Sequence, residues 1–162
     1  MSKAFKKDED DEPPLLVPRA PLPEGSPNYV TQSGLAALRA EHSELTRELL
    51  ALSPESAARE RASLKARIAE LESRLASAQW VDPSEQPRDE VRFGAHVEVV
   101  DEHGKLQRFR IVGVDEANVR EGRVAFTAPL ARALLGRRVG EAVLVKAPQG
   151  EEELEIVRIE YE

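Results

Sequence analysis

The stretch LAALRAEHSELTRELLALSPESAARERASLKARIAELESRL, residues 35–75, decides the fold of this chain. Apolar residues recur every three or four positions in both of its halves, as in the a/d seam of a coiled coil. Between the halves, Ser53 can cap a helix and Pro54 suits the first helical position. The pattern therefore predicts that the chain folds back on itself as an antiparallel helical hairpin.

The first helix is expected to begin after Thr31, a good N-cap, and to end near residue 51. The second is expected to run from Pro54 to about residue 79. His42 occupies an a position of the heptad, where a polar residue typically sets the register of the two helices. Arg74 belongs to a mixed-charge flank of the second helix, which we expect to face solvent.

Residues 1–28 have the composition of a disordered tail. Asp8–Glu12 is an unbroken acidic run, and five prolines follow between Pro13 and Pro23. Such a segment cannot bury enough apolar surface to offset the entropy of ordering it. The alternative is a docking arm in which residues 15–17 make the contact.

Composition narrows the function classes. The chain has 162 residues, of which 33% are charged and 4% aromatic, and no cysteine, which excludes disulfides and thiolate metal sites. No metal site is expected. No apolar run approaches the roughly 20 residues that span a membrane, so we expect a cytoplasmic protein. The net charge of −7 argues against independent nucleic-acid binding, which needs a basic face.

Beyond residue 81 the pattern changes. Two prolines and five charges mark residues 82–91 as a linker. The hydrophobic period then becomes two, which indicates strands. The expected strands are 96–100, 106–114, 123–126, 142–146 and 154–161, with a short helix over 130–135 that Pro129 opens. The sequence thus predicts an α+β protein with a tail (1–28), a coiled-coil hairpin (29–81), a linker (82–91) and a mostly antiparallel β domain (92–162).

Four motifs of this last domain are distinctive. They are Phe93-Gly94-Ala95-His96-Val97-Glu98, Arg108-Phe109-Arg110-Ile111-Val112-Gly113 with Asp115-Glu116, Pro129–Leu135, and Ala147-Pro148-Gln149-Gly150. Together they resemble the C-terminal domain of the Gre transcript-cleavage factors. The opening Met1–Phe5 and its acidic, proline-rich continuation resemble the GreB branch. The resemblance implies an FKBP-like domain that docks on RNA polymerase at the entrance of the secondary channel, with the hairpin entering the channel.

The tip of the hairpin departs from this family. The resemblance implies an Asp-x-x-Glu-Asn loop whose two acids help hold a second Mg²⁺ at the polymerase active centre, whereas this chain has Glu55 alone. Each arm of the hairpin is also shorter than the resemblance implies, by roughly nine residues, or about 13 Å. We therefore expect a GreB-like regulator, itself not an enzyme and without a cofactor, that binds polymerase but stimulates cleavage poorly. Glu55 is the one weak catalytic candidate, and the alternative is a charge near a helix cap.

The expected docking surface is the helix that begins at Pro129, with two acids beside it. Its candidate residues are Asp115, Glu116, Pro129, Ala131, Arg132 and Leu135. The competing interpretation places Ala131, Leu134 and Leu135 on one buried helix face, which leaves Arg132 as the exposed contact.

Other functions remain open at this point. The chain also resembles the regulators of nucleoside diphosphate kinase, which pair a short coiled coil with a similar domain. It can alternatively be an active cleavage factor that uses Glu55. An FKBP-type peptidyl-prolyl isomerase needs an aromatic-lined pocket, and this half has few aromatic residues. A coiled-coil module for some other partner is the last alternative. We expect a monomer, although Leu50 or Trp80 could pair two copies.

Overall fold

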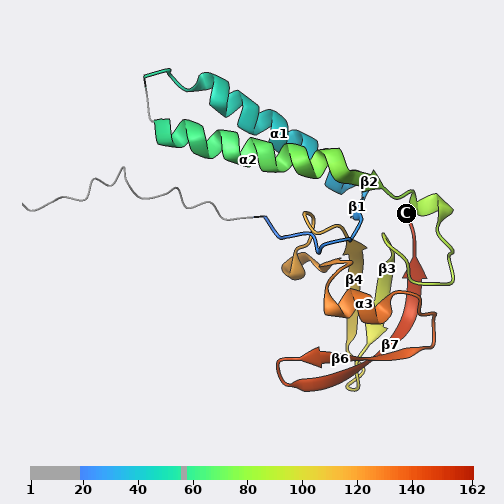
Figure 1. Ribbon diagram of the computed structural model, residues 1–162. Helices are drawn as coiled ribbons and strands as arrows, with labels where there is room; N and C mark the ends of the chain where they lie inside the picture. Colours follow the sequence, from blue (N-terminus) through green and yellow to red (C-terminus); the bar gives the residue numbers. More distant parts are fainter. Residues whose placement is uncertain (1–18, 56–57) are drawn as a thin grey trace, which may run out of the picture.

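The structure is a computed structural model that describes residues 19–55 and 58–162. Figure 1 shows a pair of long helices that projects from one end of a small β domain. The acidic run at 8–12 and the candidate arm at 15–17 lie outside the described residues. The α+β class predicted from the sequence is confirmed.

The helical hairpin consists of α1 (Gln32–Ala51) and α2 (Ala58–Ser77). The Thr31 hydroxyl caps α1 by accepting the backbone N–H of Gly34 at 3.0 Å, as predicted. The two helices pack along a shared apolar stripe whose fully covered members are Leu38, Leu45, Leu64 and Leu71. His42 lies beside this stripe, and its Nε2 is 3.0 Å from the Glu72 carboxylate of the other helix.

The bounds of the second helix differ from the prediction. Pro54 does not start α2, because Pro54 and Glu55 form a turn in which the Glu55 N–H donates to the Ser53 hydroxyl at 3.3 Å. At the other end, residues 78–80 leave the helix and form strand β2 (Ala78–Trp80). This strand pairs in parallel with β1 (Asn28–Val30), which comes just before α1.

The segment before the hairpin contacts it at three residues. Asn28 is buried, and its side-chain amide donates to the Arg74 carbonyl at 3.0 Å and to the Ser77 hydroxyl at 3.1 Å. The Ala20 carbonyl accepts a hydrogen bond from Arg74, and Arg19 lies against both helices, as described below. These three residues belong to the segment 1–28 that was expected to be a tail.

The β domain is a five-stranded sheet with one short helix, α3 (Pro129–Leu134). Its strands are β3 (His96–Val100), β4 (Leu106–Val112), β5 (Arg123–Ala125), β6 (Ala142–Ala147) and β7 (Gly150–Glu160), in the order β5-β4-β3-β7-β6. All pairs are antiparallel except β4 with β5. Five strands were predicted in these regions, but β7 begins four residues earlier and β4 ends two residues earlier than predicted. The linker contains a 3-10 turn, Pro83–Glu85.

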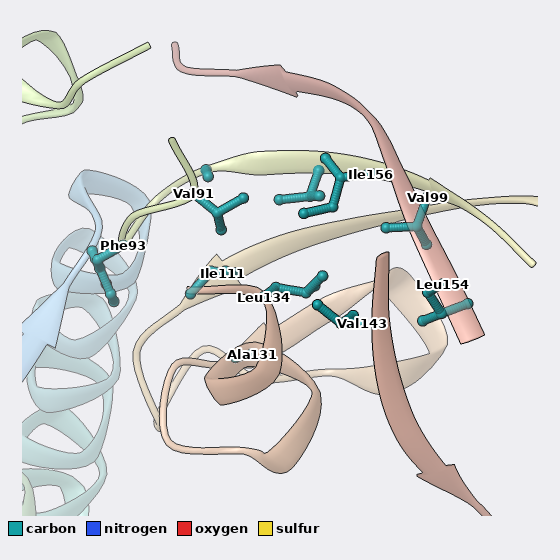
Figure 2. Close-up of a cluster of buried hydrophobic side chains, with 11 residues drawn as sticks. Val91, Phe93, Val99, Ile111, Ala131, Leu134, Val143, Leu154 and Ile156 are labelled. Atoms are coloured by element: carbon teal, nitrogen blue, oxygen red, sulfur yellow. The ribbon is translucent and has the colours of Figure 1, made fainter. Parts of the chain in front are cut away.

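The core of the β domain lies between the sheet and α3. Figure 2 shows Ala131 and Leu134 of α3 directed toward side chains of the strands, among them Ile111, Val143 and Ile156. Alternate residues of β3 are buried, as expected for a strand with one covered face. Within the described part of the chain, no helix combines the length and apolar character needed to cross a membrane.

Tyr29 of β1 connects the hairpin with this core. Its ring lies 5.6 Å from the ring of Phe93 and 5.4 Å from that of Phe126, and those two rings meet edge to face at 5.6 Å. Aromatic rings at these separations attract each other beyond the area they bury. The base of the hairpin is thus anchored in the β domain by an aromatic cluster.

Candidate functional site

Helix α3 presents only part of the predicted docking surface. Pro129 occupies its first turn and is exposed, and Arg132 is exposed one turn later. Ala131 has no accessible surface, and Leu135 is half-buried against the core. Two of the four predicted contacts on this helix are therefore available to a partner, while Ala131 contributes to packing.

Asp115 faces the hairpin rather than solvent. Its carboxylate lies 3.0 Å from Nη1 of Arg19 and 3.3 Å from Nη1 of Arg74, and only 7% of its side chain is exposed. Arg19 also pairs with Glu41 of α1, and its backbone N–H donates to Glu70 of α2 at 3.2 Å. A single carboxylate of the β domain thus joins two guanidinium groups that belong to the hairpin and the segment before it.

Glu116 makes a second connection beside the first. Its carboxylate accepts hydrogen bonds from the hydroxyls of Thr31 and Ser33, the latter at 2.8 Å. An ideal Cβ at Gly34 would lie 2.7 Å from this carboxylate, so a glycine suits the first turn of α1. We call Arg19, Arg74, Asp115 and Glu116, with the hydroxyls of Thr31 and Ser33, the clasp.

The electrostatics of the clasp favour the charged form of Arg19. Burial lowers the pKa of Arg19, but hydrogen bonds and charge attraction from Glu41 and Asp115 outweigh it and raise the pKa above its ordinary value. The guanidinium stays ionised across the usual range of pH. The clasp therefore holds the hairpin base by charge-assisted hydrogen bonds, which are stronger than neutral ones.

Sequence reasoning missed the role of two clasp residues. Arg74 was expected on a solvated flank, but it is buried and its Nη2 donates to the Ala20 carbonyl. Arg19 was assigned to the tail. The available signal was the position of Arg74 near the end of α2, where the hairpin meets the β domain, but spacing within the helix did not distinguish it from the exposed arginines.

The tip of the hairpin is polar and open. Glu55 is exposed, and the side chain of Arg61 reaches back across the turn to donate to the Ser53 carbonyl at 2.9 Å. Among the described residues, no group of three or more histidine, aspartate or glutamate side chains is arranged to hold a metal ion. Each helix has 20 residues, which gives arms about 30 Å long.

Comparisons with known proteins agree on one family. A sequence model described as "Transcription elongation factor, GreA/GreB, C-term" matches residues 86–161, which include all five strands of the large sheet and α3. The chain is similar to the transcription elongation factor GreA of Acidiphilium cryptum, with 45% identity over 106 residues. That alignment covers 64% of this chain and 68% of the relative.

The chain is also similar to a second elongation factor and to a solved structure. The transcription elongation factor GreA of Alkalilimnicola ehrlichii is 46% identical over 108 residues, which cover 65% of this chain and 68% of that protein. Among solved structures, GreA factor homolog 1 (Gfh1) of Thermus thermophilus aligns with 83% of this chain and 99% of its own, at 26% identity and a TM-score of 0.42.

Proposed function

This chain belongs to the GreA/GreB family of transcription elongation factors, and we propose that it is an accessory factor of RNA polymerase with little ability to stimulate transcript cleavage. In this proposal the β domain docks at the entrance of the secondary channel and the hairpin points into the channel. The GreB-like assignment made from the N-terminal residues remains a prediction, as does the FKBP-like description of the β domain.

The tip of the hairpin carries this proposal. A hard divalent cation prefers several oxygen ligands, and activation of water for phosphodiester hydrolysis needs the metal held in a defined position. The tip offers Glu55, whose exposed side chain extends from a turn. A single exposed carboxylate at the end of an arm about 30 Å long provides too few oxygen ligands to hold Mg²⁺ well. The protein would thus occupy the channel without supplying the second metal ligand.

The surface around α3 supports a docking role for Arg132 and Pro129. Both side chains are exposed on helix α3, whose Ala131 and Leu134 are buried in the core of the β domain. A rigid scaffold beneath a charged exposed residue favours a defined interface. Asp115 and Glu116, in contrast, are engaged by the clasp, so we propose that they act on docking through the orientation of the hairpin.

The decisive experiment measures binding and cleavage on the same backtracked elongation complexes. We expect the protein to bind polymerase and to leave the backtracked RNA largely uncut. Arg132→Ala should weaken binding about tenfold if it removes a charged contact. Lys105→Ala, at the exposed β3–β4 turn, is the matched loss of one charge and should leave binding unchanged. Absence of binding by the unaltered protein would overturn the proposal.

The exposed position of Glu55 favours one second candidate, an active cleavage factor. If the protein stimulates cleavage and Glu55→Gln abolishes it while binding persists, the single carboxylate suffices and the tip argument is wrong. Cleavage that survives Glu55→Gln would also contradict the argument, because the activity would then come from a feature other than the tip acid.

A further inference from the structure

A hollow of about 730 Å³ lies on the sheet, lined by residues of β3, β4, β5 and β7. Its polar side chains on β3 and β4 are His96, Glu98, Arg108 and Arg110, which alternate along the strands with residues of the core. The volume is in the range of pockets that hold small ligands. Neither the clasp nor the proposed docking helix uses this hollow.

Strand pairing lines up two arginines and a histidine across it. Arg123 of β5 pairs with Arg110 of β4, and Arg110 pairs with His96 of β3. Like charges directly opposite each other on neighbouring strands destabilise a sheet. The row therefore places the two arginine charges side by side, with Glu160 of β7 opposite His96 at its far end. An anion over Arg110 would offset the repulsion between the arginines.

The neighbouring arginines each have an acid of their own. Arg108 pairs with Glu98 at 2.8 Å, and close contacts pair Arg123 with Glu121 and Arg158 with Glu160. These three pairs neutralise the rim of the hollow. Of the lining arginines, Arg88 and Arg110 lie outside these three pairs, and Arg110 is the one in the strand row, beside His96.

Arg110 and His96 are incompletely satisfied. Among the described residues, Nε of Arg110 and Nε2 of His96 are both buried without a hydrogen-bond partner. Their shared acid is Glu162, whose carboxylate is 3.9 Å from Arg110 and 3.4 Å from His96, beyond good hydrogen-bond geometry. The Glu162 side chain is 73% exposed, so it can move away at little cost.

We propose that this hollow binds a small anionic ligand whose phosphate or carboxylate oxygens contact Arg110 and His96 and displace Glu162. The position of Glu162 shows that a carboxylate can approach both Arg110 and His96. A guanidinium presents a planar fork of donors that matches either kind of anion. This site is independent of the proposed polymerase-docking surface.

Isothermal titration calorimetry with the full chain tests the proposal, with pyrophosphate and citrate as the two probes. We expect millimolar or tighter binding of at least one probe, and the one that binds identifies the phosphate or the carboxylate source. Arg110→Gln should weaken binding about tenfold or more, since it removes a charged hydrogen-bond donor. Glu162→Gln should tighten it severalfold, because the competing carboxylate is gone. Arg137→Gln, exposed outside the hollow, is the control and should change nothing.

The opposite signs of the two substitutions make the test specific. Binding of neither probe would overturn the proposal, and so would equal affinities for the unaltered protein, Arg110→Gln and Glu162→Gln. Circular dichroism of each variant checks its folding. If Arg110→Gln does not fold, the increase expected for Glu162→Gln decides the question alone, because that exposed side chain is not part of the core.

Discussion

Among the glycines of the chain, Gly113 has the least space for an added Cβ, and it lies at the junction between the hairpin and the β domain. An ideal Cβ at this position would lie 2.5 Å from the carbonyl oxygen of Tyr29, a backbone atom that cannot swing aside. Gly113→Ala should therefore destabilise the protein by about 1–3 kcal/mol, the usual cost of forcing extra atoms into a packed site. Urea unfolding followed by circular dichroism measures the change.

Gly34→Ala is the informative comparison. Its Cβ would meet the flexible end of the Glu116 side chain at 2.7 Å, and alanine is the better helix former by about 1 kcal/mol. We expect a smaller loss than at Gly113. Equal losses at both positions would show that the backbone at Tyr29 yields as easily as a side chain does.

Tyr161, just after strand β7, connects that end of the sheet by hydrogen bonds with the segment before β3. Its hydroxyl donates to the Glu90 carbonyl at 2.5 Å and accepts the Arg92 N–H at 2.7 Å. Tyr161→Phe removes both bonds and should cost about 1 kcal/mol at neutral pH. Burial raises the pKa of this hydroxyl, the nearby Glu90 and Asp89 add to the increase, and the hydrogen bond from Arg92 opposes it.

The raised pKa of Tyr161 sets the sign of a pH effect. The native state keeps the proton longer than the unfolded chain, so the contribution is complete below about pH 10 and declines as the pH rises above that value. The difference in unfolding free energy between the unaltered protein and Tyr161→Phe should be full at pH 8. Above pH 10 this difference should become smaller. A constant difference between the two proteins over this range would contradict the shift.

The sequence predicts the structural role of some residues and not of others. Thr31 was predicted as a cap because a cap is a local feature that lies within three residues of its partner. The burial of Arg74 was not predicted, since its partner Asp115 follows 41 residues later. For the same reason Asp115 and Glu116 were assigned to a docking surface: their acidic character is visible in the sequence, but the cations and hydroxyls that engage them are not.

At the level of elements, the clasp connects the hairpin with the β domain. Asp115→Ala would leave Arg19 and Arg74 without their shared carboxylate in a largely buried place. Removing one partner of a buried ion pair is costly, and we expect a loss of about 2–4 kcal/mol, measured by thermal or urea unfolding. Glu44→Ala breaks an exposed pair with Arg47 on α1 and should cost no more than about 0.5 kcal/mol.

A second readout separates the clasp from simple packing. Residual dipolar couplings report the angle between α1 and the strands, and in Asp115→Ala we expect this angle to become variable while both parts remain folded. An unchanged, fixed angle would show that the aromatic cluster around Tyr29 suffices to orient the hairpin.

Elements with a clear period were predicted well. Strand β3 alternates between buried and half-buried positions along its whole length, and Pro129 opens α3 as expected. The two short strands β1 and β2 escaped notice because three residues carry no recognisable period and their pairing joins residues 50 positions apart. The start of α2 was placed too early because Ser53 caps a turn and not the helix.

Over the whole molecule, two separate hydrophobic cores are joined at one place. One core lies between the sheet and α3, and the other runs along the hairpin. Tyr29 packs against the first core while the adjacent Val30 is buried in the second. Helices of about 20 residues are only marginally stable without tertiary contacts, so the hairpin depends on this junction more than the sheet does.

The cooperativity of unfolding follows from this arrangement. In the unaltered protein, loss of helix, measured by circular dichroism at 222 nm, and loss of sheet, measured by amide hydrogen exchange in β3 and β7, should occur at the same urea concentration. Tyr29→Ala removes the ring between Phe93 and Phe126 and should let the hairpin unfold at lower urea than the sheet. Tyr29→Phe keeps the ring and should keep the two transitions together. Coincident transitions in Tyr29→Ala would mean that the remaining contacts, the clasp among them, couple the two cores without the Tyr29 ring.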